Sequence, residues 1–285
     1  MLLELAIGDA YGAGFEYADA PILKRNDLSG YIKHPKHDIR PGQYTDDTQM
    51  SLAIAEAIVS EVPWTPESLA KGFVEVFHRD PHEGYASRFY AFLQQTKTGQ
   101  EFLANIRAES DKSGSAMRAS PIGVFGDIAE VLEKASIQAK LTHDTPAGIA
   151  AAQASALMTH YFLYDLGSKS DLGNFLDAKV PGYQWASTWQ GEVGAKGWMS
   201  VRAAVTAVTR NDSLSEVLRD SINFGGDVDT VATIALAAAS CSHEVSQDLP
   251  QHLVDALEND TYGRDYILAL DAQLLAKVSG RSPLV

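Results

Sequence analysis

The spacing of apolar residues is the feature of this sequence that most constrains its fold. Apolar residues recur every three or four positions through most of the chain, which is the period of helices buried on one side. Alternating runs of β-branched residues, which are typical of strands, are nearly absent. We therefore predict helices over residues 50–62, 68–77, 122–135, 147–164, 198–208, 214–224, 230–239 and 266–278.

No linker rich in Pro, Ser or Gly divides the 285 residues, and no repeat recurs at a fixed period. Two acidic clusters, described below, lie near opposite ends of the helical part of the chain. If they share one site, the helices between them belong to the same domain. We therefore predict an all-α fold with a single compact domain over residues 1–285.

The charge of the chain limits the ligands that it can take. A formal net charge of -14 argues against a broad nucleic-acid groove, which needs clustered Lys and Arg. It leaves room for a small anion in a local pocket. Residues 24–40 are locally basic, and we favour a solvated loop there over a lid that reaches a ligand.

The cysteine count and the N-terminal sequence bear on the compartment. Cys241 is the only cysteine, which rules out an intrachain disulfide and a thiolate zinc cluster and is compatible with a reducing compartment. Residues 1–7 lack the basic and apolar regions of a signal peptide. No apolar run reaches the roughly 20 residues of a membrane span. We expect a cytoplasmic protein without membrane contact.

Two short acidic clusters each open an apolar, Ala-rich stretch. Residues 45–48 read Thr-Asp-Asp-Thr, and residues 225–230 read Gly-Gly-Asp-Val-Asp-Thr. Capping alone explains either cluster, because Asp and Thr are good helix caps. Each cluster nevertheless supplies more oxygens than a cap needs, and the adjacent carboxylates of Asp46 and Asp47 repel each other unless a cation is near. Together they offer the hard oxygen ligands that suit Mg²⁺, Mn²⁺ or Ca²⁺ rather than zinc.

Three further segments carry polar chemistry, and each has a plainer interpretation. Residues 8–16 hold three glycines with Asp9 and Glu16, which favours either close helix packing or ligand contact. Residues 113–121 can present backbone N–H groups to a phosphate or form an ordinary loop. Within them, Arg118 can pair with a carboxylate of the site or with the ligand. His143 precedes a long apolar helix, where it either reaches a ligand or lies at the surface.

Taken in order, these segments resemble the motifs of the ADP-ribosylglycohydrolase family, which includes the dinitrogenase reductase-activating glycohydrolases. The resemblance rests on residues 8–16, 45–48, 114–121, 142–143 and 225–230. The chain departs from the family pattern at Ser113, where relatives usually have Asn. It departs again at residues 237–241, where relatives usually have a Gly-Ala-x-x-Gly stretch.

The resemblance implies an all-α orthogonal helical fold of this family's type with two Mg²⁺ or Mn²⁺ ions. It implies two catalytic residues, Glu16 and Asp47, with Glu16 positioning or deprotonating water. The implied metal ligands are Thr45, Asp46, Asp47, Asp227, Asp229 and Thr230. The implied substrate-binding residues are Asp9, Ser113, Gly114, Ser115, Met117 and His143.

The activity implied is hydrolysis at the anomeric carbon of ADP-ribose, which releases it from a modified acceptor. We favour a protein side chain such as arginine as the acceptor. We expect the protein to be a monomer. The alternatives are a non-catalytic ADP-ribose-binding module, a hydrolase of ADP-ribosylated nucleic acid or of a small-molecule conjugate, and a purely structural helical protein. Residues 17–40 and 183–189 are expected to form the rim that selects the acceptor.

Overall fold

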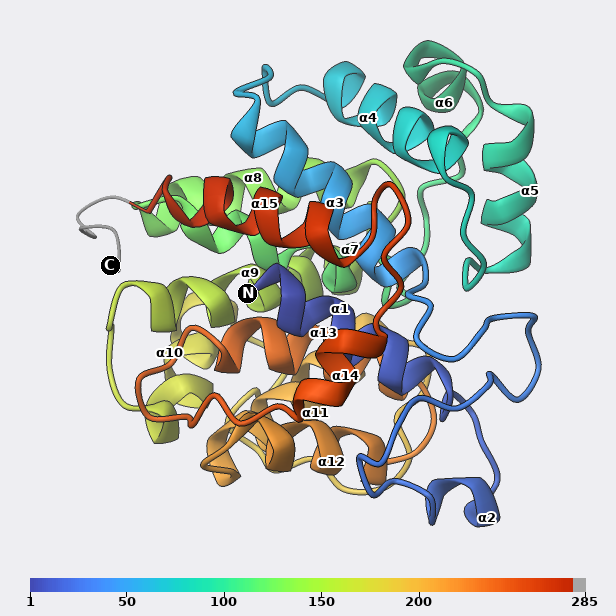
Figure 1. The fold of residues 1–285 in the computed structure, drawn as a ribbon. Helices are drawn as coiled ribbons and strands as arrows, with labels where there is room; N and C mark the ends of the chain where they lie inside the picture. The colour runs from blue at the N-terminus through green and yellow to red at the C-terminus, as the bar shows by residue number, and fades with distance from the viewer. Residues whose placement is uncertain (279–285) are drawn as a thin grey trace.

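The computed structural model describes residues 1–278, and every regular element within them is a helix (Figure 1). The β pairing in this range consists of isolated bridges. The all-α prediction is therefore confirmed. The elements are α1 Leu2–Ala13, α2 Ala20–Leu23, α3 Asp46–Val59, α4 Pro66–Arg79, α5 Ser87–Gln95, α6 Gly99–Asn105, α7 Gly114–Met117, η1 Ser120–Val124, α8 Ile128–Lys140, α9 Pro146–Leu163, η2 Lys169–Asp171, α10 Leu172–Lys179, α11 Gly197–Arg210, α12 Leu214–Asn223, α13 Val228–Ala239, α14 Gln251–Ala256 and α15 Arg264–Leu275.

Helix α13 is the centre of the core. Its sequence is rich in Ala, the best helix former, and apolar on all sides, which is the pattern of a helix with no solvent face. All of its residues are buried. Helices α1, α9, α11 and α12 pack around it, and Figure 1 shows α1 and α9 beside it in the middle of the molecule.

Two glycines of α1 let it approach α13 closely. A Cβ atom at Gly8 would lie 2.7 Å from the carbonyl oxygen of Ala232, and one at Gly12 would lie 2.4 Å from Cα of Asp229. No other residue fits at such distances. Close helix packing is thus the structural role of these glycines, and it brings the end of α1 to the start of α13.

The starts of two further helices meet at this same place. Helix α3 packs against α1 and α13, and the short helix α7 contacts α3, α9 and α13. Helices α4, α5 and α6 form an outer group, seen at the upper right of Figure 1. The fold therefore gathers four segments that are distant in sequence, and these hold all the predicted site residues except His143.

One predicted helix is wrong. Residues 122–135 do not form a continuous helix, because η1 ends at Val124 and Phe125 is extended. Helix α8 then begins afresh after Asp127, whose carboxylate accepts a hydrogen bond from the backbone N–H of Glu130 at 3.1 Å. The apolar spacing continues through this break and so hides it. Within residues 1–278, no helix has the length and apolar character needed to cross a membrane.

Candidate active site

A cavity of about 740 Å³ lies where the end of α1 meets the starts of α3, α7 and α13. The segment 84–112 supplies much of the remaining wall. The structure thus brings together residues that the sequence places up to 214 positions apart, from position 16 to position 230. The predicted site residues that line this cavity are Glu16, Asp46, Asp47, Ser113, Gly114, Met117, His143, Asp227, Asp229 and Thr230.

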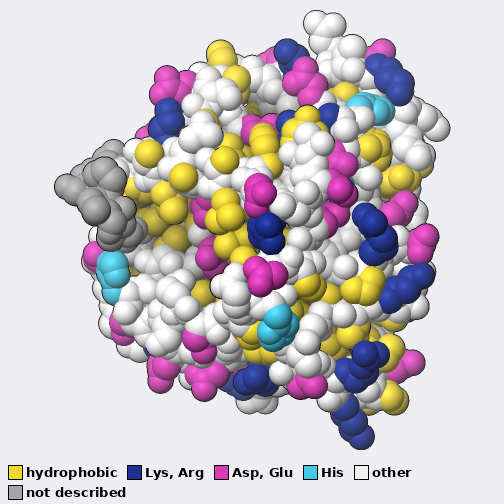
Figure 2. Space-filling model, viewed as in Figure 1, with side chains coloured by type: hydrophobic (Ala, Val, Ile, Leu, Met, Phe, Trp, Pro, Cys, Tyr) yellow, Lys and Arg dark blue, Asp and Glu magenta, His cyan; other side chains and the backbone are white. Residues whose placement is uncertain are grey.

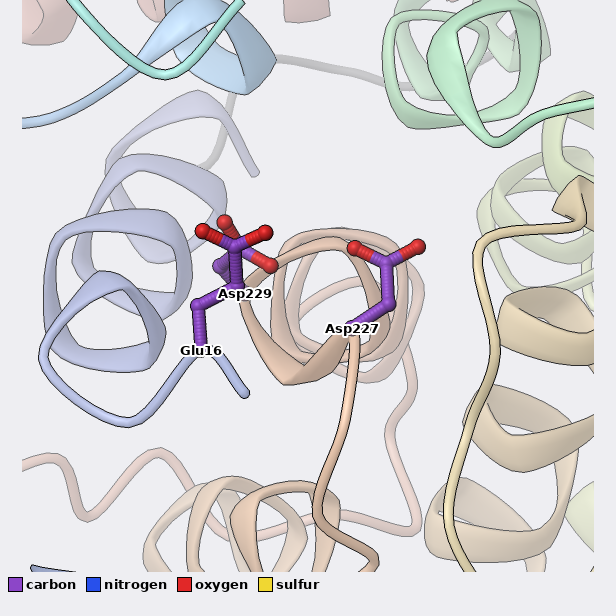
Figure 3. Close-up of side chains that lie close together, drawn as sticks. All are labelled: Glu16, Asp227 and Asp229. Carbon is purple, nitrogen blue, oxygen red and sulfur yellow. The ribbon is translucent and has the colours of Figure 1, made fainter. Parts of the chain in front are cut away.

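Three carboxylates form the tightest acidic group of the cavity. Oxygen atoms of Glu16, Asp227 and Asp229 lie within 4.8 Å of one another. Figure 3 shows the carboxylates of Glu16 and Asp229 side by side, with that of Asp227 pointing to the same side of the ribbon. Glu16 follows the end of α1, whereas Asp227 and Asp229 stand at the start of α13.

The turn before α13 depends on glycine. Gly225 and Gly226 have φ of 72° and 85°, in the left-handed region that glycine adopts without strain. A Cβ atom at Gly226 would lie 1.9 Å from the carbonyl oxygen of Val193, so no side chain fits there. The Gly-Gly pair thus lets the backbone turn sharply and place Asp227 and Asp229 on the cavity.

Asp9 on α1 fixes the start of α3 through hydrogen bonds. Its Oδ1 accepts the hydroxyl of Thr45 at 2.7 Å, and its Oδ2 accepts the backbone N–H groups of Thr45 and Thr48, both at 2.9 Å. Asp9 is fully buried and does not line the cavity, and neither does Thr45. The structure places Asp9 as a support that aims Asp46 and Asp47 into the cavity.

Crowding makes these carboxylates difficult to ionise. Burial, together with the charges of Asp9 and other neighbouring carboxylates, raises the pKa of Asp46 and of Asp47 well above the usual range. Burial and Glu16 do the same to the pKa of Asp229. Burial and Glu16 raise the pKa of Asp227 to about 6, although the hydroxyls of Ser113 and Ser200 oppose this.

The residues present fit a divalent cation. Oδ2 of Asp47 is buried and makes no hydrogen bond within residues 1–278. An orphaned carboxylate oxygen is costly unless a cation takes it as a ligand. The acidic side of the cavity offers carboxylate and hydroxyl oxygens from Asp46, Asp47, Asp227, Asp229 and Thr230, the kind of donor that Mg²⁺, Mn²⁺ and Ca²⁺ prefer.

Glu16 is held by His34, a residue that belongs to none of the predicted motifs. His34 Nδ1 accepts the backbone N–H groups of Lys36 and His37, both at 2.9 Å. The ring proton therefore sits on Nε2, which donates to the carboxylate of Glu16 at 2.8 Å. Tyr17, the next residue, donates its backbone N–H to the carbonyl of Gly226, so Glu16 is tied to both α13 and the loop around His34.

The segment around α7 forms the next part of the wall. Ser113, Gly114 and Met117 line the cavity, whereas the Ser115 hydroxyl donates to the carbonyl of Gly148 and faces away from the cavity. Arg118 lines the cavity but makes no ion pair with a carboxylate within residues 1–278. It donates instead to neutral acceptors, described below.

Aromatic and basic residues complete the cavity, and sequence reasoning missed them. Tyr85, Phe89 and Phe92 supply rings, and the exposed cations Arg88, Arg107 and Lys112 make no hydrogen bond or ion pair through their side chains within residues 1–278. These residues sit on short helices and loops without a recognisable motif. Only the fold shows that they face the acidic side.

Only part of the predicted rim lines the cavity. Tyr17 and His37 line the cavity, but residues 183–189 do not, and Trp185 is fully buried with its Nε1 donating to the carbonyl of Val180. The Lys and Arg residues of segment 24–40 do not line the cavity either. Figure 2 shows basic side chains gathered at the lower right, over the region of α2 in Figure 1, as expected for a solvated loop.

Comparisons with known proteins agree on one family. The family model described as ADP-ribosylglycohydrolase matches residues 1–283. ADP-ribosylarginine hydrolase Tri1 of Serratia proteamaculans is 24% identical, over 90% of this chain and 74% of its own. The ADP-ribosyl-[dinitrogen reductase] glycohydrolase of Rhodospirillum rubrum is 25% identical, over 90% of this chain and 88% of its own.

Human ADP-ribosylhydrolase ARH3 is 25% identical, over 85% of this chain and 84% of its own. A solved structure titled "ADP-ribosylglycohydrolase-related protein complex" superposes with a TM-score of 0.74 at 22% identity, covering 97% of this chain and 96% of that chain. The structural likeness supports the fold, and the family match covers all the site segments described above.

Proposed function

Because this chain belongs to the ADP-ribosylglycohydrolase family, we propose that it is a hydrolase that removes ADP-ribose from a modified acceptor. The observation that carries the proposal is the convergence of carboxylates from α1, α3 and α13 on one cavity. Helix capping does not explain this convergence, because the side chain of Thr45 caps α3 and that of Asp227 makes no cap hydrogen bond at the start of α13. A shared ligand explains why separate helix starts face each other.

The distribution of charge supports a ligand that is both anionic and rich in hydroxyls. Carboxylates stand on the side formed by α1, α3 and α13, whereas the segment 84–112 supplies Arg88, Arg107 and Lys112 beside a single carboxylate, Glu109. Unpaired cations suit a diphosphate, and the rings nearby suit a nucleobase. ADP-ribose has both groups, with its free ribose at the other end.

We propose that two Mg²⁺ or Mn²⁺ ions bind Thr45, Asp46, Asp47, Asp227, Asp229 and Thr230. Thr45 stays in this set because its hydroxyl gives its hydrogen to Asp9 and keeps oxygen lone pairs. When bound, such ions would supply positive charge that holds ribose hydroxyls and stabilises negative charge on oxygen. They would also relieve the repulsion among the carboxylates that burial and crowding create.

The residues of the chain then have separate roles. Cleavage of a glycosidic bond builds positive charge at the anomeric carbon, which nearby carboxylates stabilise. Glu16 takes the proton of the attacking water. Asp47, at the start of α3, is the second proposed catalytic residue. His34 keeps the carboxylate of Glu16 at the cavity by donating to one of its oxygens.

For the acceptor we propose a protein side chain, with arginine first. Two relatives are named for ADP-ribosylarginine and for dinitrogen reductase, which is a protein. A guanidinium leaving group also suits the acidic side of the cavity. The test is to supply ADP-ribosylated arginine, serine, nucleic acid and small-molecule conjugates, and to measure the release of free ADP-ribose.

That panel separates a hydrolase from a non-catalytic binding module. The hydrolase releases ADP-ribose repeatedly from at least one acceptor, and most rapidly from arginine if the acceptor proposal holds. A binding module takes up ADP-ribose, measured by calorimetry, and releases none from any conjugate. Binding without release in the presence of Mg²⁺ or Mn²⁺ would overturn the proposed activity.

A further inference from the structure

A buried threonine connects a buried cation to a histidine of the cavity. Nη2 of Arg118 donates to Oγ1 of Thr142 at 2.7 Å, and the same Oγ1 lies 2.7 Å from Nδ1 of His143. Arg118, Thr142 and His143 are 1%, 5% and 7% exposed. Water therefore has little access to this chain of hydrogen bonds, and each hydrogen in it needs a partner within the protein.

Counting donors fixes the proton on the imidazole. A guanidinium only donates, so the oxygen of Thr142 accepts from Arg118. The one hydrogen of that hydroxyl has a single acceptor within residues 1–278, which is Nδ1 of His143. Nδ1 is then unprotonated, and a neutral ring carries its proton on Nε2. The opposite tautomer would leave the hydroxyl hydrogen buried without an acceptor.

Arg118 is itself held firmly in place. Its Nε donates to Oε1 of Gln138 at 2.7 Å, its Nη2 donates to the Gln138 carbonyl at 3.1 Å, and the guanidinium lies 4.5 Å from the ring centre of Phe73. Burial, with the added charges of Arg118 and Lys112, lowers the pKa of His143 to about 3. The ring of His143 is thus neutral at physiological pH.

The free side of the imidazole faces the cavity. His143 lines the cavity, and its Nε2 makes no hydrogen bond with residues 1–278. The ring lies against Gly114, where a Cβ atom would come within 2.9 Å of Cε1. The N–H on Nε2 is therefore available to a ligand next to the backbone at the start of α7.

We propose that Arg118 and Thr142 are positioning residues that lock His143 in the Nε2–H tautomer, so that the ring offers a neutral N–H donor to an anionic group in the cavity. The identity of that group as the diphosphate of ADP-ribose rests on the proposed function. The tautomer itself does not depend on any ligand.

The decisive experiment is NMR of the imidazole in protein with labelled histidine, free of ligand. The ¹³Cδ2 and ¹⁵N shifts of His143 report which nitrogen carries the proton. Wild type and Thr142→Ser should show Nε2–H, because serine keeps the hydroxyl. Thr142→Val keeps the shape of the side chain and should show a mixture of tautomers. Nδ1–H in wild type, or an unchanged tautomer in Thr142→Val, would overturn the proposal.

Arg118→Met tests the first link in the same way. It keeps an unbranched side chain, shorter than that of arginine, but removes the donor, so the Thr142 hydroxyl becomes free to turn and the tautomers should mix. A pure Nε2–H signal in this variant would remove Arg118 from the proposal. If Arg118→Met does not fold, the comparison of Thr142→Ser with Thr142→Val still decides whether the hydroxyl sets the tautomer.

Binding of free ADP-ribose provides the functional arm. Thr142→Val should bind ADP-ribose roughly tenfold more weakly than wild type, the loss expected for one misdirected hydrogen bond to a charged group. Thr142→Ser should bind ADP-ribose as tightly as wild type. A wild type with the expected tautomer and no affinity for ADP-ribose would contradict the proposed function only. Normal affinity in a Thr142→Val protein whose tautomers have mixed would contradict the ligand contact of His143.

Discussion

The carboxylate of Asp9 on α1 accepts the hydroxyl of Thr45 at 2.7 Å and thereby fixes the first turn of α3. The same carboxylate accepts the backbone N–H of Thr48. A residue that does not line the cavity thus holds the helix turn from which Asp46 and Asp47 project. The site rests on this contact between two helices as much as on its own carboxylates.

Asp9→Asn should therefore weaken both the fold and the site. The amide nitrogen of Asn cannot accept, so at least one hydrogen bond is lost, at a cost of about 1.5–3 kcal/mol for bonds to a charged group. We expect a lower free energy of unfolding in urea and weaker Mn²⁺ binding. Asp19→Asn is the control, because Asp19 begins α2 without a side-chain cap. Equal effects of the two variants would contradict the supporting role of Asp9.

Gly84 is a second residue that supports the start of α3. Its φ is 106°, and a Cβ atom there would lie 2.5 Å from Oδ1 of Asp46 and 2.6 Å from Cβ of Thr45. Gly182 has a φ of 107° with nothing within 4 Å, so it is a matched control. Both Gly→Ala variants should lose about 1–2 kcal/mol from the backbone conformation. Only Gly84→Ala should also lower metal affinity and turnover, as measured by calorimetry and by ADP-ribose release.

Glu16→Gln separates proton transfer from metal binding. Loss of a general base lowers turnover by roughly 10²–10⁴-fold. Glutamine keeps the shape of the side chain, so metal content measured by atomic spectroscopy should remain at the wild-type level. Glu192→Gln is the control, since Glu192 is exposed, lies beside the Gly225–Gly226 turn and does not line the cavity. Near-normal turnover in Glu16→Gln would exclude its role as base.

His82 should make stability depend on pH. Burial lowers the pKa of His82, but the hydrogen bond and charge of Glu258, helped by Asp80, raise it overall above its ordinary value of 6.5. The contribution to stability is complete below the unfolded pKa and is lost as pH rises through the higher folded pKa. As pH rises above the ordinary value of 6.5, wild type should lose more free energy of unfolding than Glu258→Gln. Identical slopes would show that the pair is not coupled to folding.

The sequence predicted most of the long helices well, because α11 and α12 each have one apolar face of regular period and α9 and α13 are long apolar runs. Helix α1 (Leu2–Ala13) was not predicted. Helices α9, α11, α12 and α13 begin and end within a few residues of the predicted bounds. Short helices such as α5 and α6 were missed, because one or two turns carry too few residues for a period to show. The apolar spacing across residues 122–135 concealed the break at Phe125, since a 3₁₀ turn and a helix can bury the same side chains.

The candidate site was predictable where function needs several oxygens in a short stretch. Asp46, Asp47, Asp227 and Asp229 stand out for this reason, and the structure brings them to one cavity. Residues that act by supporting others had no such signal. His34 reaches Glu16 only because the loop after α2 folds back over the end of α1.

The measurement that tests the account most directly is the release of ADP-ribose from ADP-ribosylarginine as Mg²⁺ is varied, for wild type and Asp47→Asn. Oδ2 of Asp47 is buried and makes no hydrogen bond within residues 1–278, so it needs a cation as its partner. We predict that wild type is inactive with chelator and recovers with Mg²⁺ or Mn²⁺, while the folded variant loses at least roughly 100-fold in rate at any metal concentration. Release that is independent of metal, or a variant as fast as wild type, would contradict the account.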